Sequence, residues 1–224
     1  MELLVAENLS FSYSNRFQKV DAVKDVSCTF ESGNAYAIVG KSGSGKTTLL
    51  SLLAGLEQPT EGRVLFDGKP LSEQDTDAYR LYEAAVIYQS FNLFPVLTAE
   101  ENVMYPQVLR GTPKKEARIK AHEALRSVGI DEKMFKRIPT RLSGGEQQRV
   151  AIARAICAEN RIILADEPTG NLDITNGEQV VELLLRLAHD EGRCVIIVTH
   201  DLEIAGQTDR IYMMRNGSLE SEQS

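Results

Sequence analysis

A glycine-rich segment, residues 40–47, constrains the fold of this chain more than any other part of the sequence. It reads Gly-Lys-Ser-Gly-Ser-Gly-Lys-Thr and follows residues 35–39, an apolar run that is typical of a buried strand. Residues 47–54 are rich in leucine and stop at Gly55, a pattern that predicts a helix with a glycine C-cap. The order of strand, glycine loop and helix predicts an α/β fold.

The glycine-rich segment matches the pattern G-x-x-x-x-G-K-[ST] of phosphate-binding loops. Glycines allow successive backbone N–H groups to turn towards an anion, and the N-terminus of the following helix adds about half a positive charge. Lys46 can reach the β- and γ-phosphates, and the Thr47 hydroxyl can bind Mg²⁺. A glycine-rich turn without a ligand is the alternative, which the flanking strand and helix disfavour. The predicted nucleotide ligands are Gly40, Lys41, Ser42, Gly43, Ser44, Gly45, Lys46, Thr47 and Thr48.

A second apolar strand ends in two carboxylates. Residues 162–165 read Ile-Ile-Leu-Ala and are followed directly by Asp166 and Glu167. A Mg²⁺–nucleotide site needs a carboxylate at the end of a strand beside the phosphate loop. Because adjacent residues of an extended strand point to opposite sides, the two carboxylates cannot share one task. We assign Asp166 to the metal and Glu167 to the attacking water, as the general base.

Hydrophobic periodicity divides the rest of the chain. Strands are predicted over residues 3–13, 20–30, 62–66, 84–88, 161–165, 194–199 and 211–215. Residues 92–160 have a helical period and form a predicted insertion, with a capping box from Thr98 to Glu101 and Thr112 as the cap before Pro113. Asn216 and Gly217 predict a hairpin turn, and we expect the polar tail beyond them to fray.

Composition excludes several classes of protein. The chain has 224 residues, 42% of them hydrophobic, which is typical of a folded domain and excludes disorder as its main state. Its formal net charge of −7 disfavours a nucleic-acid partner, and we expect none. No apolar run approaches the roughly 20 residues of a membrane helix, and no secretory signal is visible at the N-terminus, so we expect a cytoplasmic protein.

Residues 142–149, Leu-Ser-Gly-Gly-Glu-Gln-Gln-Arg, complete a recognisable set of motifs. With the phosphate loop and the Asp-Glu pair, they resemble the nucleotide-binding subunit of ATP-binding-cassette (ABC) transporters, whose signature motif they match. The residues themselves predict a helix start, because Ser143 and Glu146 have the spacing of a capping box. Gly144 and Gly145 leave backbone N–H groups open to an anion, although a plain capped helix is the alternative.

The resemblance implies roles for further residues. Gln89 resembles the glutamine that contacts Mg²⁺ and water and couples the site to a membrane partner. His200 resembles the histidine that hydrogen-bonds the γ-phosphate, and Asp173 belongs to a segment resembling the loop beside the signature. Tyr13 resembles the aromatic residue that stacks on adenine, but an ordinary strand aromatic is the alternative.

The resemblance extends from about residue 3 to residue 217 and implies one nucleotide-binding domain over residues 1–224. Its fold is a phosphate-loop NTPase core of the α/β class, with a mixed sheet, an N-terminal antiparallel β-subdomain and an inserted α-helical subdomain. The core and β-subdomain are expected at about 1–90 and 160–218, and the helical subdomain at about 91–160. In that family each ATP lies between the loop of one copy and the signature of another, so a second copy is an expected partner.

An apolar loop predicts a further partner. Phe91, Leu93, Phe94 and Leu97 follow Gln89 closely, and loops seldom hold so many apolar residues unless a surface covers them. We expect them, with Tyr105, to line a groove for a cytoplasmic helix of a membrane permease. The alternative is that they pack the helical insertion.

Within the family, residues 169–173 and 89–93 most resemble the lipoprotein-releasing, macrolide-efflux and cell-division ATPases. The resemblance implies an ATPase that uses ATP and Mg²⁺ and lies at the inner face of the membrane through its permease. A non-transporting membrane signalling or cell-division complex is the alternative function. A soluble ABC protein acting on nucleic acid is disfavoured, because this chain has one cassette and no long coiled coil.

Overall fold

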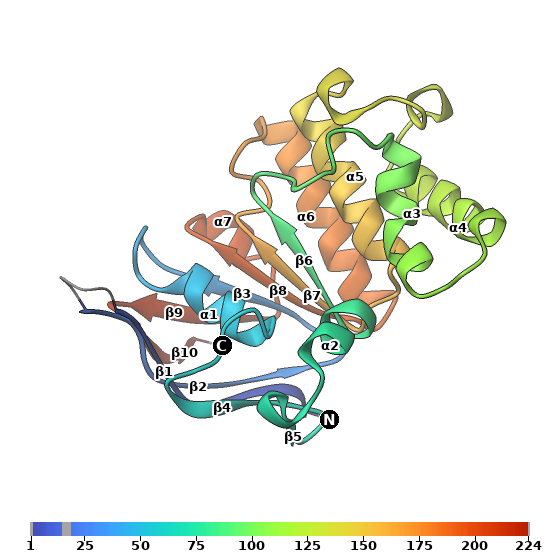
Figure 1. Ribbon diagram of the computed structural model, residues 1–224. Coiled ribbons are helices and arrows are strands. Elements are labelled where there is room, and N and C mark those ends of the chain that lie inside the picture. The colour runs from blue at the N-terminus through green and yellow to red at the C-terminus, as the bar shows by residue number, and fades with distance from the viewer. Residues whose placement is uncertain (1, 15–18, 224) are drawn as a thin grey trace.

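Two β-sheets and the helices that pack against them make up the molecule (Figure 1). The computed structural model describes residues 2–14 and 19–223. One sheet has six strands in the order β10-β9-β3-β8-β7-β6, and the other has four in the order β2-β1-β4-β5. The expected α/β fold with a mixed sheet, an antiparallel N-terminal sheet and an inserted helical part is confirmed.

The six-stranded sheet positions the candidate site. Its strands are β3 (Ala35–Val39), β6 (Ala84–Tyr88), β7 (Ile162–Asp166), β8 (Cys194–Thr199), β9 (Arg210–Arg215) and β10 (Ser218–Gln223). Neighbouring strands from β9 to β6 run parallel, and only the β9–β10 pair is antiparallel. Every residue of β3 and β8 is buried, which explains their unbroken apolar sequences. The carboxyl ends of β3, β6, β7 and β8 therefore meet at one edge of the sheet.

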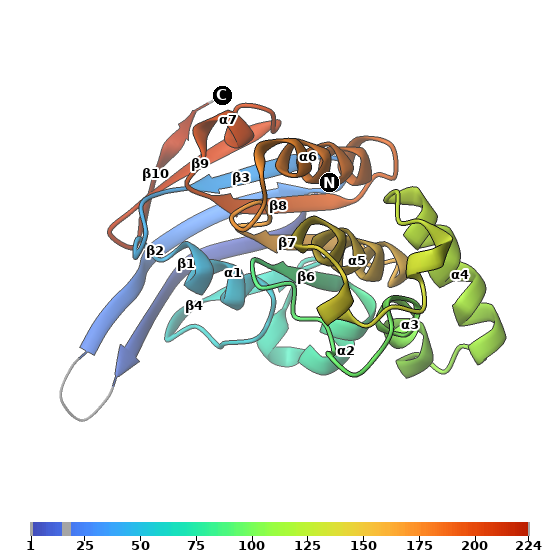
Figure 2. The same ribbon diagram turned by 90° about the horizontal axis from the view of Figure 1, so that it is seen from above.

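The four-stranded sheet covers one face of this core (Figure 2). It consists of β1 (Glu2–Ser14), β2 (Lys19–Glu31), β4 (Glu61–Phe66) and β5 (Lys69–Pro70), all in antiparallel pairs. Helix α1 (Lys46–Leu53) lies between the two sheets, and its buried leucines pack against Leu4 and Phe30 of the antiparallel sheet. The predicted leucine-rich helix is thus buried on nearly all sides and ends, as expected, before Gly55 with φ +63°.

Helices α3 (Ala99–Leu109), α4 (Lys114–Ser127), α5 (Gly144–Cys157) and α6 (Ile174–His189) gather on the other side of the molecule (Figure 1). The predicted apolar face of α4 is buried, and its alanines share a core with Val150, Val180 and Leu184. Both predicted capping boxes, at Thr98 and at Ser143, are present. Within the described residues, no helix is both long enough and apolar enough to cross a bilayer.

Three local expectations differ from the structure. Helix α4 begins one residue later than predicted, because Pro113 itself is the N-cap and Thr112 donates its hydroxyl to Gln107. Helix α2 (Thr76–Tyr82) was not predicted, since Tyr79 is its only buried residue and its sequence has no apolar period. The polar tail does not diverge from the sheet but continues as β10 beside β9. The last helix, α7 (Leu202–Ala205), follows β8.

Gly62 fixes the contact between β4 and an irregularity in β1. The β1–β4 register shifts between Glu7 and Ser10, and Asn8 has φ +48° at this point. A Cβ atom at Gly62, which has φ +78°, would lie 2.3 Å from the carbonyl oxygens of both Glu7 and Asn8. Only glycine fits this conformation and this approach.

Substitution of Gly62 by alanine is expected to lower the free energy of unfolding by about 3 kcal/mol, since backbone strain and a backbone clash add together. Gly68→Ala is the matched control. Gly68 also has a positive φ, +73°, but has open space where its Cβ would lie, so we expect a loss of about 1 kcal/mol. Urea denaturation of both variants measures the difference, and equal losses would contradict the steric explanation.

Candidate functional site

A cavity of about 1430 Å³ opens at the carboxyl edge of the six-stranded sheet. It brings together residues from β1, the β3–α1 loop, β6, β7 and β8, which are far apart in the sequence. The predicted site residues that line it are Tyr13, residues 40–48, Gln89, Asp166, Glu167 and His200. The topology explains this convergence, because parallel strands present their carboxyl ends at the same edge.

The β3–α1 loop has the form of an anion-binding site. Gly43 and Gly45 have φ values of +76° and +105°, which turn successive N–H groups inwards. Lys46 starts α1 and is buried, and its Nζ donates to the carbonyl oxygens of Gly40 at 2.7 Å and Lys41 at 3.2 Å. The first turn of α1 has no acidic residue, so no side chain competes for the positive end of the helix dipole.

The backbone of β2 and the backbone of β9 pack closely against this loop. A Cβ atom at Gly40 would lie 2.3 Å from the carbonyl oxygen of Met214, and one at Gly45 would lie 2.2 Å from that of Ala22. The loop is therefore packed against β2 and β9 at a distance that only glycine permits. Any side chain at these two positions would displace the loop from its place above the sheet.

Thr47 and Asp166 form the candidate metal site. Thr47 donates its hydroxyl to Asp166 Oδ1 at 3.2 Å, and Gln89 lines the same cavity. Burial raises the pKa of Asp166; the Thr47 hydrogen bond opposes this rise, and the Glu167 charge adds to it. Hydroxyl, amide and carboxylate oxygens suit Mg²⁺, which usually takes one or two protein ligands and completes its shell with phosphates and water. In the part of the chain that the structure describes, no group of three His, Cys, Asp or Glu side chains is placed so that it could hold a metal ion by itself.

Glu167 and His200 form a second pair in the cavity. His200 Nδ1 lies 3.0 Å from each carboxylate oxygen of Glu167. Glu167 has φ +46°, and its backbone N–H donates to Val198 of the neighbouring strand at 2.9 Å. The positive φ of Glu167 ends β7 directly after Asp166, and both carboxylates line the same cavity.

Gln89 and Tyr13 also line the cavity. The Gln89 carbonyl accepts from Asn171 Nδ2 at 2.9 Å, and a Cβ at Gly170 would lie 2.6 Å from the Gln89 amide nitrogen. The segment after β7 therefore packs closely on Gln89. Tyr13 is 48% exposed, lies edge-on to Phe11, and has its hydroxyl 3.4 Å from that of Thr48. Its exposed ring offers a flat face that a base could stack on.

The signature segment lies outside this cavity. Ser143 caps α5: its Oγ accepts from the Glu146 N–H at 3.3 Å, and Glu146 Oε2 accepts from the Ser143 N–H at 2.7 Å. Gly144 and Gly145 follow in the first turn, and none of these residues lines the cavity. The structure thus presents two separate helix N-termini that suit anions, α1 inside the cavity and α5 outside it.

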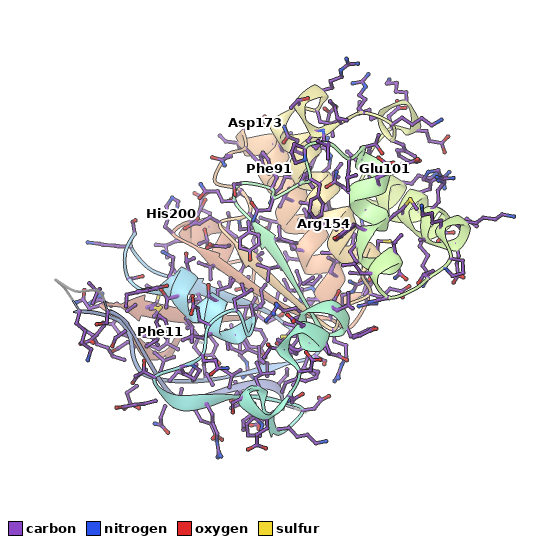
Figure 3. All side chains as sticks on the ribbon, viewed as in Figure 1. Phe11, Phe91, Glu101, Arg154, Asp173 and His200 are labelled. Carbon is purple, nitrogen blue, oxygen red and sulfur yellow. The ribbon has the colours of Figure 1, made fainter. Side chains whose placement is uncertain are left out.

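Asp173 also lies outside the cavity of its own chain. It caps α6, and its carboxylate accepts from the Asn176 backbone N–H at 2.9 Å and from Asn176 Nδ2 at 2.7 Å. Arg149 of α5 donates to Asn176 Oδ1 at 2.9 Å, which joins Asp173 to the signature helix. Figure 3 shows Asp173 at the helical end of the molecule, well separated from Phe11 in the antiparallel sheet.

The sequence matches a family model described as ABC transporter over residues 23–170, about two thirds of the chain. An uncharacterized ABC transporter ATP-binding protein, YclH of Bacillus subtilis, is 41% identical over 98% of this chain and 96% of that protein. The lipoprotein-releasing system ATP-binding protein LolD of Idiomarina loihiensis is 40% identical over 99% of this chain and 98% of that protein.

The chain belongs to the ABC transporter family. Solved structures agree with this assignment. The dimeric structure of MJ0796, a bacterial ABC transporter cassette, superposes with a TM-score of 0.92 at 36% identity and covers 99% of this chain and 98% of that one. A second dimeric structure of MJ0796, in a post-hydrolysis state with ADP and Pi, gives a TM-score of 0.91. The expected ATPase activity, with ATP and Mg²⁺ as its ligands, is confirmed at the level of the family.

Several residues of this ABC cassette line the cavity without having been predicted. They are Val20, Asp21, Ala22, Lys24, Val39, Leu202, Met213, Asn216 and Gly217. They come from β2, the end of β3, α7 and the β9–β10 hairpin, which the fold brings to the phosphate loop. No sequence motif marks them, although the Asn-Gly turn at 216–217 was visible as a hairpin.

Lys46→Ala is expected to raise the dissociation constant for ATP by roughly 100-fold or more, because the phosphates lose a buried cation. Lys41→Ala is the matched control, since Lys41 contributes its backbone N–H to the loop, which alanine keeps, and its side chain is exposed. We expect the control to change affinity by less than about threefold. Titration calorimetry with ATP measures both constants, and micromolar affinity retained by Lys46→Ala would contradict the assignment.

Proposed function

We propose that this chain is the ATP-hydrolysing subunit of a bacterial ABC complex that dimerises on ATP and drives a separate membrane permease. The observation that carries the proposal is the separation of the two anion-binding helix ends. The loop before α1 lines the nucleotide cavity, whereas Ser143 at the start of α5 does not. A second copy would supply its own Ser143 to the phosphate held by the first.

ATP itself would hold the two copies together. Its γ-phosphate carries the charge that both helix ends favour, and loss of this group on hydrolysis would remove the shared contact. The dimeric MJ0796 cassettes, one of them with ADP and Pi, support this arrangement for a chain of the same fold. Each copy would act as a single nucleotide-binding domain.

The residues around the γ-phosphate would divide the work of hydrolysis. Glu167 would accept a proton from the attacking water, and His200, hydrogen-bonded to it, would orient the carboxylate and contact the phosphate. Thr47, Asp166 and Gln89 would hold Mg²⁺, which when bound neutralises phosphate charge. Tyr13 would stack on the base, and Ser143, Gly144, Gly145 and Asp173 would act from the partner copy.

A second cleft, of about 390 Å³, suits the permease. It lies between α2, β6, α3 and α5, and the rings of Phe94 and Tyr105 line it with centroids 4.7 Å apart. Of the other loop residues, Leu93 packs against the helical core, and Phe91 and Leu97 do not line this cleft. The groove that we propose for a cytoplasmic helix of the permease therefore depends on Phe94 and Tyr105 more than on Leu93.

The identity of 40% with LolD supports a complex of the lipoprotein-releasing and macrolide-efflux kind, in which the permease exports a molecule or transmits motion. We therefore place the chain in the cytoplasm, peripheral at the inner face of the membrane through its permease. The composite ATP site and the docking cleft would serve a signalling or cell-division complex equally well, and the substrate would be handled by the permease chain.

Glu167→Gln is expected to slow ATP hydrolysis by a factor of about 10² or more while ATP still binds, because the general base is lost. An ATP-dependent dimer should therefore accumulate. Size-exclusion chromatography with light scattering, run with and without ATP, measures the dimer, and phosphate release measures turnover. Hydrolysis at the parental rate would contradict the role given to Glu167.

Phe94→Asp is expected to reduce co-purification of the permease at least about tenfold, because a charge would enter an apolar contact. Val96→Asp is the matched control. Val96 belongs to the same loop and is 83% exposed, but it does not line the cleft. Pull-down of each tagged variant from detergent-solubilised membranes measures retention, and equal retention by the two variants would contradict docking at this cleft.

A further inference from the structure

Arg154 is a half-buried cation that lines the docking cleft without a carboxylate partner among the described residues. Its NH1 donates to the carbonyl oxygen of Asn92 at 2.7 Å and its NH2 to that of Phe91 at 3.3 Å. Desolvation lowers the pKa of Arg154, and the nearby Tyr88 opposes this shift. A guanidinium removed from water normally pairs with a carboxylate, since neutral carbonyls offset less of its charge.

The other charged side chains of the cleft already have partners. Arg80 pairs with Asp77 and also donates to the carbonyl oxygen of Gly55. These three side chains, Asp77, Arg80 and Arg154, are the charged residues that line the cleft within the described parts of the chain. Their charges leave one net positive charge, and it belongs to Arg154.

The remaining walls of the cleft are mostly apolar. Phe94 and Tyr105 are 40% and 37% exposed, and Leu56 and Leu109 are 44% and 55% exposed. A helix that docks here must therefore present an apolar face. One negative charge within that face would neutralise the uncompensated charge of Arg154.

We propose that the cleft receives a helix of the permease that carries an aspartate or glutamate on its apolar face, and that this carboxylate pairs with Arg154. The proposal rests on the proposed function, because it concerns the same cleft, and it specifies the chemistry of the occupant. An apolar peptide without an acidic residue would leave Arg154 as it is in the free chain.

The pair would connect the cleft to the nucleotide. Arg154 donates to the carbonyl oxygens of Phe91 and Asn92. These two residues have φ values of +63° and +44°, which non-glycine residues seldom adopt. They follow Gln89 by two and three residues, and Figure 3 shows Phe91 and Arg154 in the same region of the molecule. A carboxylate that takes donors from Arg154 would loosen its hold on this loop and so move Gln89. Arg154 would then be a positioning residue.

The test uses the permease that co-purifies with the wild-type chain, reconstituted with it in membranes. Arg154→Gln keeps an N–H donor for the backbone carbonyls but removes the charge, and nucleotide affinity checks that the variant folds. Each Asp and Glu in the permease loops on the side of the membrane that faces this chain is replaced by its amide. The readout is the factor by which the permease stimulates ATP hydrolysis.

We expect Arg154→Gln and one of the permease substitutions each to lower this factor about tenfold. The double variant should lose less than about twofold more, because both changes remove the same contact. Exchange of the charges, with Arg154→Glu and the same permease residue changed to Arg, should restore part of the stimulation. Arg80→Gln is the control. Any loss of stimulation that it causes should be additive with the loss caused by every permease substitution.

Additive losses for every permease carboxylate, with no restoration by charge exchange, would overturn the proposal, as would a second copy of this chain in the cleft. The proposed function would survive that result if Phe94→Asp still released the permease. Failure of any permease to co-purify with the wild-type chain would overturn the proposed function and this inference together.

Discussion

The close packing of the phosphate loop on two backbone carbonyls is the constraint on which the rest of the site depends. Gly40 and Gly45 have no room for a Cβ atom against Met214 and Ala22. This contact fixes the loop between β2 and β9, so that the start of α1 faces the ends of β7 and β8. Thr47 then meets Asp166, and the cavity contains Glu167 and His200 as well. Preorganised N–H groups of this kind favour a phosphate without reorganisation on binding.

The starts of α1 and α5 do not line a common cavity in this fold. The start of α1 is buried at the sheet edge, whereas the start of α5 belongs to the helical side, where Arg149 and Asn176 connect it to Asp173. The segment from Gln89 to Asn92 touches both regions: Asn171 donates to the Gln89 carbonyl, and the Phe91 ring lies near Gly144. This segment therefore connects the nucleotide cavity with the signature and with the cleft, where Arg154 donates to its carbonyl oxygens.

Much of this arrangement could be predicted from the sequence, because local rules determine it. The loop at residues 40–47, the Asp-Glu pair at the end of β7 and the capping box at Ser143 all follow from patterns over a few residues. The sequence did not predict α2, whose single buried tyrosine gives no period, or the correct start of α4 at Lys114. Long-range contacts could not be predicted from the sequence either. The carbonyl groups that pack on the phosphate loop and the isolated charge of Arg154 can be recognised only in the folded structure.

Whether one nucleotide is shared between two copies is tested by identifying the copy that supplies Ser143 to a bound nucleotide. A tagged Lys46→Ala chain, whose own loop cannot hold ATP, is mixed with untagged Glu167→Gln chains and an ATP analogue that carries a photoreactive group on its γ-phosphate. We expect the tagged chain to be labelled near Ser143 in the mixture and not to be labelled alone. Labelling confined to the untagged chains, at every ratio of the two, would contradict a nucleotide shared between two copies.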